Sequence, residues 1–121
     1  MNNELTAQEL HQIAMNHIGK ELEEKGFEFI AINSQLKKHP QFVCVDAENK
    51  LHFVMVSAVL YPNNPSEYDT LFMETFVNHA NKKNATVLFA GVGIANSTDF
   101  NLPITKQSDY TINYEGIQTI S

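Results

Sequence analysis

The stretch Gln41-Phe-Val-Cys-Val-Asp-Ala-Glu-Asn-Lys-Leu-His-Phe-Val-Met-Val-Ser57 decides the fold of this chain. It contains two runs of apolar and β-branched residues, which favour strands, and the polar pair Glu48–Asn49 between them favours a tight turn. We therefore predict two strands, Gln41–Ala47 and Leu51–Tyr61, joined as a hairpin. The second strand is long and almost wholly apolar, which is typical of a central strand that is covered on both faces.

The segments before the hairpin follow a helical and then an extended pattern. The capping box Thr6-x-x-Glu9 predicts a helix that begins just after Thr6, and Gly26 suits the left-handed position that ends a helix. We predict a strand over Phe27–Ile32 and a polar loop over Asn33–Pro40. The buried stripe of the helix is expected at Leu10, Ile13, Ala14, Ile18 and Leu22.

A second helix is predicted after the break at Pro62–Ser66. We expect Asn64 to cap it, with Pro65 at its first helical position, and we expect it to fade near Lys82–Asn84. A buried strand then opens the segment Ala85–Ala95. The apolar face of the helix is expected at Tyr68, Leu71, Phe72, Thr75, Phe76, Val77 and Ala80.

The rest of the chain is polar and irregular up to Tyr110–Tyr114, a candidate for a final strand at the sheet edge. We expect Gly91 and Gly93 to allow a bulge or a close backbone approach, since a dinucleotide-binding turn needs a third glycine and a following helix. The chain is predicted to be a single α/β (α+β) domain, with a core over residues 1–95 and an extension over 96–121. Its predicted order is αβββαβ, in which a helical crossover leads to a parallel strand and helices flank a mixed sheet.

Composition and charge narrow the classes of function. The chain has 121 residues, 43% of them hydrophobic, which is enough for one packed core. Its net charge of −6 opposes phosphate backbones, so no nucleic-acid partner is expected. The sequence contains no signal-peptide pattern and no apolar run of membrane-spanning length. We therefore expect a cytoplasmic protein with no membrane partner.

The single cysteine, Cys44, rules out an internal disulfide and a metal site built from several thiolates. It lies in an apolar strand, where a free cysteine usually behaves as a small buried hydrophobe. Catalysis by Cys44 with the nearby His52 is the weaker alternative. Asp46, Glu48 and His52 could gather a metal at the hairpin turn, but the chemistry of the turn explains Asp46 and Glu48 as solvated loop residues. We predict no cofactor and no metal.

The order of elements resembles the core of the PD-(D/E)XK nuclease superfamily, and it is closest to the small bacterial proteins related to Holliday junction resolvases. Those proteins carry a helix ending in Leu-x-x-x-Gly, a Gly-Glu-x-Asp segment, and a strand ending in Phe-Val-Glu-Val-Lys. The matching places here read Leu22-Glu-Glu-Lys-Gly26, His39-Pro-Gln-Phe42 and Phe53-Val-Met-Val-Ser57. The resemblance covers about the first ninety residues and implies a restriction-endonuclease-like fold.

The residues that nuclease chemistry needs are missing at these positions. The enzymes hold a divalent metal with acidic oxygens, and the metal activates water. Here Phe42 stands at the Asp position, Met55 at the Glu position and Ser57 at the Lys position. The helix glutamate of the family falls near Met15. The resemblance therefore implies a frame without catalytic residues, with a vestigial pocket bounded by Phe42, Met55 and Ser57.

Three classes of function remain. The first is a non-catalytic interaction module that pairs as a homodimer or binds another protein, and the tyrosines Tyr110 and Tyr114 favour such an interface. The second is a small-ligand-binding protein that uses the vestigial pocket. The third is a metal-dependent nuclease with relocated ligands. The lost acids favour the first two classes, so we do not predict an enzyme.

Overall fold

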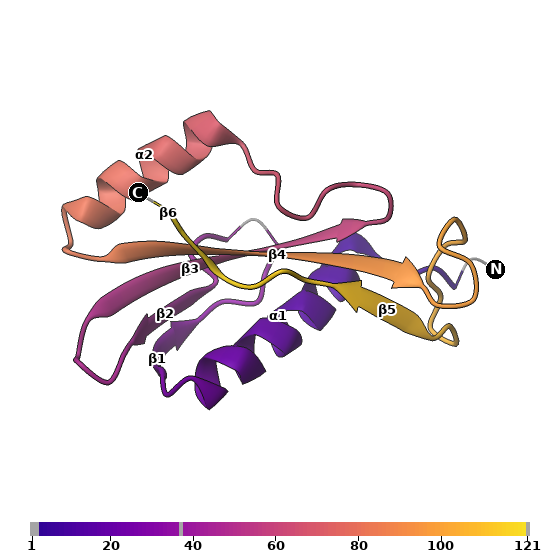
Figure 1. The fold of residues 1–121 in the computed structure, drawn as a ribbon, viewed down its shortest axis with the longest axis horizontal. Coiled ribbons are helices and arrows are strands. Elements are labelled where there is room, and N and C mark those ends of the chain that lie inside the picture. The colour runs from indigo at the N-terminus through magenta and orange to yellow at the C-terminus, as the bar shows by residue number, and fades with distance from the viewer. Residues whose placement is uncertain (1–2, 37, 121) are drawn as a thin grey trace.

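The computed structural model describes residues 3–36 and 38–120, and these residues form two helices and six strands (Figure 1). The elements are α1 (Ala7–Glu24), β1 (Glu28–Ile32), β2 (Phe42–Val45), β3 (Leu51–Leu60), α2 (Thr70–Asn81), β4 (Thr86–Asn96), β5 (Tyr110–Asn113) and β6 (Gln118–Ile120). The predicted αβββαβ order is confirmed. The prediction contained no strand corresponding to β6.

The six strands form one mixed sheet in the order β1-β2-β3-β4-β5, with β6 also paired to β4. The pairs β1–β2 and β2–β3 are antiparallel, whereas β3 and β4 run parallel, as a helical crossover requires. On the far side of β4, β5 pairs with Gly93–Asn96 and β6 pairs with Val87–Phe89. The C-terminal segment thus completes the sheet, and the boundary predicted at residue 95 lies inside β4.

The two helices lie on opposite faces of the sheet (Figure 1). A hydrophobic cluster lies between each helix and the sheet. Val54 and Val56 of β3 are buried against α1, on what we call the α1 face. Phe53 and Met55, which alternate with them, are buried against α2, on the α2 face. Alternate side chains of a strand point to opposite faces, so β3 is covered on both sides. The predicted central position of this strand is confirmed.

The predicted ends of α1 are also confirmed. The Glu9 N–H donates to the Thr6 hydroxyl at 3.1 Å, and the Thr6 N–H donates to the Glu9 carboxylate at 2.9 Å. This reciprocal pair satisfies two donors that a helix start would otherwise leave free. At the other end Gly26 has a φ of +88°, the left-handed conformation that glycine adopts without strain.

The predicted start of α2 is wrong. The helix begins at Thr70, and its N-cap is Asp69, whose side chain accepts the Phe72 N–H at 3.0 Å. The Asn64 side chain instead accepts the Ser66 N–H at 2.9 Å, which closes a local turn. Pro65 is buried, and its carbonyl lies directly on Gly91 of β4. The segment before α2 therefore covers the sheet in an irregular form, and the predicted close backbone approach at Gly91 is confirmed.

Tyr110–Tyr114, the segment predicted as an edge strand, pairs within its own chain. Residues Tyr110–Asn113 form β5, which hydrogen-bonds to β4. The ring of Tyr114 packs edge-on against His17 with 5.2 Å between ring centroids, and its hydroxyl donates to the carboxylate of Glu21. Both contacts fasten the tail to α1, so Tyr114 is engaged inside the domain.

Candidate functional site

The structure separates the three residues of the predicted vestigial pocket. Phe42 pairs with Val54 and is buried on the α1 face, whereas Met55 is buried on the α2 face. Ser57 lies two residues beyond Met55 and therefore points to the same side. A pocket bounded by all three residues does not exist, because the sheet lies between them. The β3 side chains that share the face of Phe42 are Val54 and Val56.

A groove of about 310 Å³ does lie beside Phe42, between α1 and β1, and we call it the α1–β1 groove. Met15, near which the resemblance places the helix glutamate of the nucleases, lines it together with Phe42. Two of the four matched positions thus meet in one concavity. The apolar lining is Met15, Phe29, Ile32 and Phe42, and the polar lining is Gln12, Asn16, Lys20, Glu23 and Ser34.

The chemistry of this groove suits apolar contact. The Phe29 and Phe42 rings lie against each other, with centroids 5.3 Å apart, and form a bulky apolar wall. Met15 adds a thioether, which is a soft group that Mg²⁺ does not select. Lys20 and Glu23 are the only charged residues in the lining. Across residues 3–36 and 38–120, no group of three or more His, Cys, Asp or Glu side chains could hold a metal ion.

Gln41 extends the pairing of β2 with β3, a role that the sequence pattern did not indicate. Its side-chain oxygen accepts the Val56 N–H at 2.8 Å, so the side chain extends the hydrogen-bond ladder just before β2 begins at Phe42. Its side-chain amide also bonds to the His39 ring, with 3.0 Å between Gln41 Nε2 and His39 Nδ1. These bonds explain why a glutamine is fully buried at this position.

His11 is a second buried polar residue that sequence reasoning did not single out. Among the described residues, neither of its ring nitrogens has a hydrogen-bond partner. Burial lowers the pKa of His11, and the nearby His39 lowers it further, so the ring is neutral at neutral pH. A neutral, buried imidazole contributes to the core as a compact flat group.

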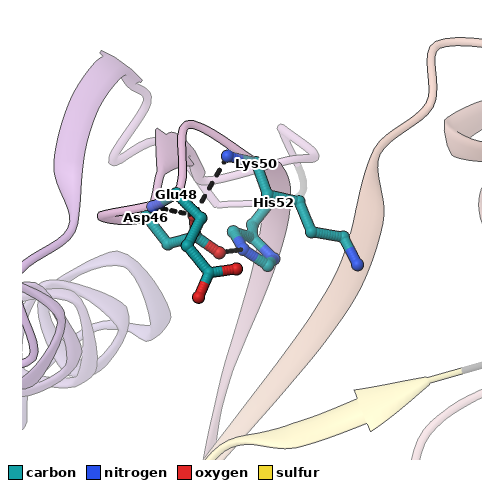
Figure 2. A network of polar contacts seen from close by, with 4 residues as sticks. All are labelled: Asp46, Glu48, Lys50 and His52. Carbon is teal, nitrogen blue, oxygen red and sulfur yellow. Dashed lines mark hydrogen bonds and ion pairs between the residues drawn. The ribbon is translucent and has the colours of Figure 1, made fainter.

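The hairpin turn between β2 and β3 is held by Asp46 (Figure 2). One carboxylate oxygen accepts the backbone N–H groups of Glu48 and Lys50 at 2.9 and 3.0 Å, and the other accepts His52 Nε2–H at 2.9 Å. The hydrogen bond from His52, followed by that from the Lys50 N–H, lowers the pKa of Asp46. The hydrogen bonds of the turn therefore account for Asp46, and the Nε2 atom of His52 is engaged in one of them.

We expect Asp46→Ala to lower the free energy of unfolding at neutral pH. The pKa of Asp46 in the folded protein lies below its unfolded value of about 3.9. The ionised carboxylate therefore contributes to the free energy of unfolding above the unfolded pKa, and this contribution is lost as the pH falls through the folded pKa. Urea unfolding at neutral pH and near pH 3 measures this, and the difference between wild type and variant should shrink on acidification. Glu48→Ala is the control, because Glu48 is an exposed residue of the same turn, and it should change the free energy of unfolding little at either pH.

Cys44 lies opposite His52 in the register of β2 and β3, and His52 in turn bonds to Asp46, so the three residues of a possible thiol site are neighbours. Cys44 is fully buried, however, and burial with the nearby Asp46 charge raises the pKa of its thiol to about 11. A thiol in this state supplies almost no thiolate at neutral pH, so Cys44 is part of the core.

We expect Cys44 to resist thiol reagents in the folded protein. Its reaction with an aromatic disulfide reagent should be more than about a hundredfold slower in the native state than in urea. In the native state the reagent cannot reach the buried sulfur, and almost none of the thiol is ionised. Absorbance of the released thiolate measures the rate. Rapid reaction of the native protein at neutral pH would show that Cys44 is reachable, and would return it to the candidates for catalysis.

Residues 8–120 match the family described as a domain of unknown function, DUF8840. The chain belongs to this family. No curated protein and no solved structure matches it. The DUF8840 match runs from the first turn of α1 to the last residue of β6, so it includes the groove, the hairpin turn and the tail. Neither described helix has the length and apolarity needed to cross a bilayer.

Proposed function

We propose that this DUF8840 protein is a non-catalytic interaction module that binds an extended segment of a partner protein along β1. The observation that carries the proposal is an apolar groove beside a free edge strand. β1 is the last strand at its end of the sheet, and no strand in the described part of the chain pairs with its outer edge. An edge of this kind offers unpaired backbone donors and acceptors to another strand.

The side chains of β1 support the same mode of binding. Ile30 and Ile32 are 61% and 58% exposed, which is unusual for isoleucine in a strand. A strand added to β1 would cover them. Its side chains on the α1 face would reach the α1–β1 groove, where Phe29 and Phe42 provide apolar contact. Strand addition typically draws affinity from backbone hydrogen bonds and specificity from such side-chain pockets.

Two local features restrict which segment fits. The pairing of β1 with β2 shifts register between Phe29 and Ala31, so a bulge bends the edge and discourages unselective pairing. The carboxylates of Glu23 and Glu28 lie at the groove and at the start of β1. A partner with a bulky apolar residue and a basic residue near these carboxylates is therefore favoured.

The binding part of the proposal is tested by selecting short random peptides on the immobilised protein. We expect selected peptides to share one bulky apolar and one basic residue, and to lose affinity for Ile32→Lys. Leu71→Lys is the matched control, because Leu71 is 75% exposed on α2, an element outside the groove. Peptides that bind both variants as well as wild type would contradict a site at β1.

A second copy of the chain is an alternative occupant, which light scattering of the same three proteins identifies. A dimer that Ile32→Lys abolishes and Leu71→Lys keeps would place self-association at β1. A dimer that both variants keep would place the interface elsewhere and contradict the proposal. If the wild-type protein is a monomer, β1 is not used for self-association, and the proposal then depends on the peptide selection. A monomer for which no binding peptide is selected would overturn the proposal.

The non-catalytic part is tested with DNA. Clean protein with Mg²⁺ or Mn²⁺ is expected to leave a plasmid and a branched junction intact, because Phe42 and Met15 offer no oxygen ligand at the matched positions. Metal-dependent cutting that Asp46→Ala abolishes would overturn this and give Asp46 a catalytic role. Both DNA substrates are needed, since the resembled proteins are related to enzymes that act on branched DNA.

A further inference from the structure

A second concavity lies at the carboxyl ends of β3 and β4, remote from the α1–β1 groove in the sheet order. It has a volume of about 330 Å³, which is near the lower end for small-molecule sites. β4 and β5 form its floor, and the rings of Tyr61 and Phe100 stand beside it. We infer that this concavity, here called the Tyr61–Phe100 pocket, binds a small uncharged planar molecule.

The pocket exists because β4 carries only small residues on this part of its α2 face. Gly93 and Ala95 of β4 alternate with Ile94, which is buried in the cluster on the α1 face, so the two small residues point to the α2 face. On that face the segment around Pro65 covers Gly91 and touches the position of Gly93. The concavity lies beyond the Pro65 segment, at Gly93 and Ala95, where β4 has no large side chain on the α2 face.

The two aromatic walls are exposed although each has an apolar neighbour. Tyr61 and Phe100 are 49% and 48% exposed, and their ring centroids lie 5.2 Å apart with 57° between the ring planes. Aromatic faces gain most from contact with another planar apolar surface. A flat ring placed on the strand floor would lie beside both Tyr61 and Phe100 and could add an aromatic contact with each.

The lining also indicates the charge of the ligand. None of the residues that line the pocket is ionisable apart from the Tyr61 phenol, and the polar groups are the side chains of Asn63, Thr111 and Asn113. A charged molecule would lose its hydration there without gaining an opposite charge. Amide and hydroxyl groups can bond to the polar edge of a neutral ring, so an uncharged heteroaromatic molecule matches both the walls and the rim.

The walls are held in place before any ligand arrives. The Tyr61 N–H donates to the Ile94 carbonyl at 3.1 Å, which fixes Tyr61 to the end of β4. The loop that carries Phe100 is fastened by Asn96, whose side chain donates to the Pro103 carbonyl at 3.0 Å and accepts the Thr98 N–H at 2.9 Å. A preformed pocket spends less binding free energy on ordering its walls.

Titration of the ¹⁵N-labelled protein with indole, followed by amide chemical shifts, tests the inference. We expect saturable shifts at Gly93, Ala95 and Thr111 and none at Ile32. Tyr61→Ala and Phe100→Ala should each weaken binding by about tenfold, the size expected when one aromatic contact is lost. Leu102→Ala is the control, because Leu102 is an exposed residue of the same loop that does not line the pocket, and it should bind as wild type does.

Indole-3-acetate tests the charge argument, since it adds a carboxylate to the same ring system. We expect it to bind more weakly than indole, and equal or stronger binding would overturn the assignment to uncharged ligands. The absence of saturable shifts with indole, or shifts that Tyr61→Ala and Phe100→Ala leave unchanged, would overturn the site itself. Ile32→Lys should bind indole as the wild type does. A failure of the pocket proposal can therefore be distinguished from a failure of the proposed peptide site at β1.

Discussion

Val56→Asp is expected to leave the protein unable to fold. Val56 is 3% exposed and packs in the cluster between β3 and α1, where its neighbours are apolar. A carboxylate there would have no positive partner and would cost several kcal/mol, against a total stability of about 5–15 kcal/mol for a typical domain. Circular dichroism and urea unfolding of whatever protein stays soluble measure the outcome.

Leu60→Asp is the matched control for this change. Leu60 is the last residue of the same strand and is 40% exposed, so water can solvate a carboxylate at that position. This variant should fold and unfold cooperatively, with a loss small enough to measure by urea unfolding. A soluble Val56→Asp protein that unfolds cooperatively would show that β3 is not buried on the α1 face.

The parts of the fold that sequence predicted correctly depend on signals confined to a few residues. The capping box at Thr6 and Glu9 needs only the first turn of α1, and both of its bonds form. The unbroken apolar run of β3 indicates burial on both faces, and this can be inferred without knowing which elements pack against the strand. The parallel pairing of β3 with β4 follows because a helix lies between them in the chain.

The predicted start of α2 is wrong because a distant contact overrides local preference. Asn64 followed by Pro65 is a good helix start in isolation. In the folded chain the Pro65 carbonyl lies on Gly91, and the chain becomes helical only at Thr70. Asp69 then provides the cap that Asn64 was expected to supply. No pattern within the segment itself records the contact with β4.

The candidate site depended on strand register, which sequence does not reveal. Phe42 lies opposite Val54, and this pairing puts Met55 on the other face of the sheet. A shift of one residue reverses the face of every side chain, so a pocket inferred from matched positions on two strands can be split in this way. Met15 and Phe42 did come together, because both lie on the α1 face.

Gly91→Ala is expected to have the largest effect of any exchange that adds a single carbon to a glycine of the sheet. A Cβ at this position would lie 1.8 Å from the Pro65 carbonyl oxygen and 2.7 Å from its carbon. Both are backbone atoms, so no change of rotamer can relieve the overlap. Either β4 or the segment before α2 must move, and overpacking of this kind typically costs about 1–3 kcal/mol, sometimes more. We expect the upper end of that range in urea unfolding.

Gly19→Ala supplies a control in which the expected sign is reversed. Gly19 lies inside α1, where alanine is favoured over glycine by about 1 kcal/mol. An added Cβ there would lie 3.4 Å from the nearest ring atom of Phe42, which is an ordinary contact. The free energy of unfolding should therefore rise slightly in Gly19→Ala and fall sharply in Gly91→Ala. An unchanged unfolding midpoint in Gly91→Ala would mean that Pro65 does not cover β4, and the floor of the Tyr61–Phe100 pocket would then extend to Gly91.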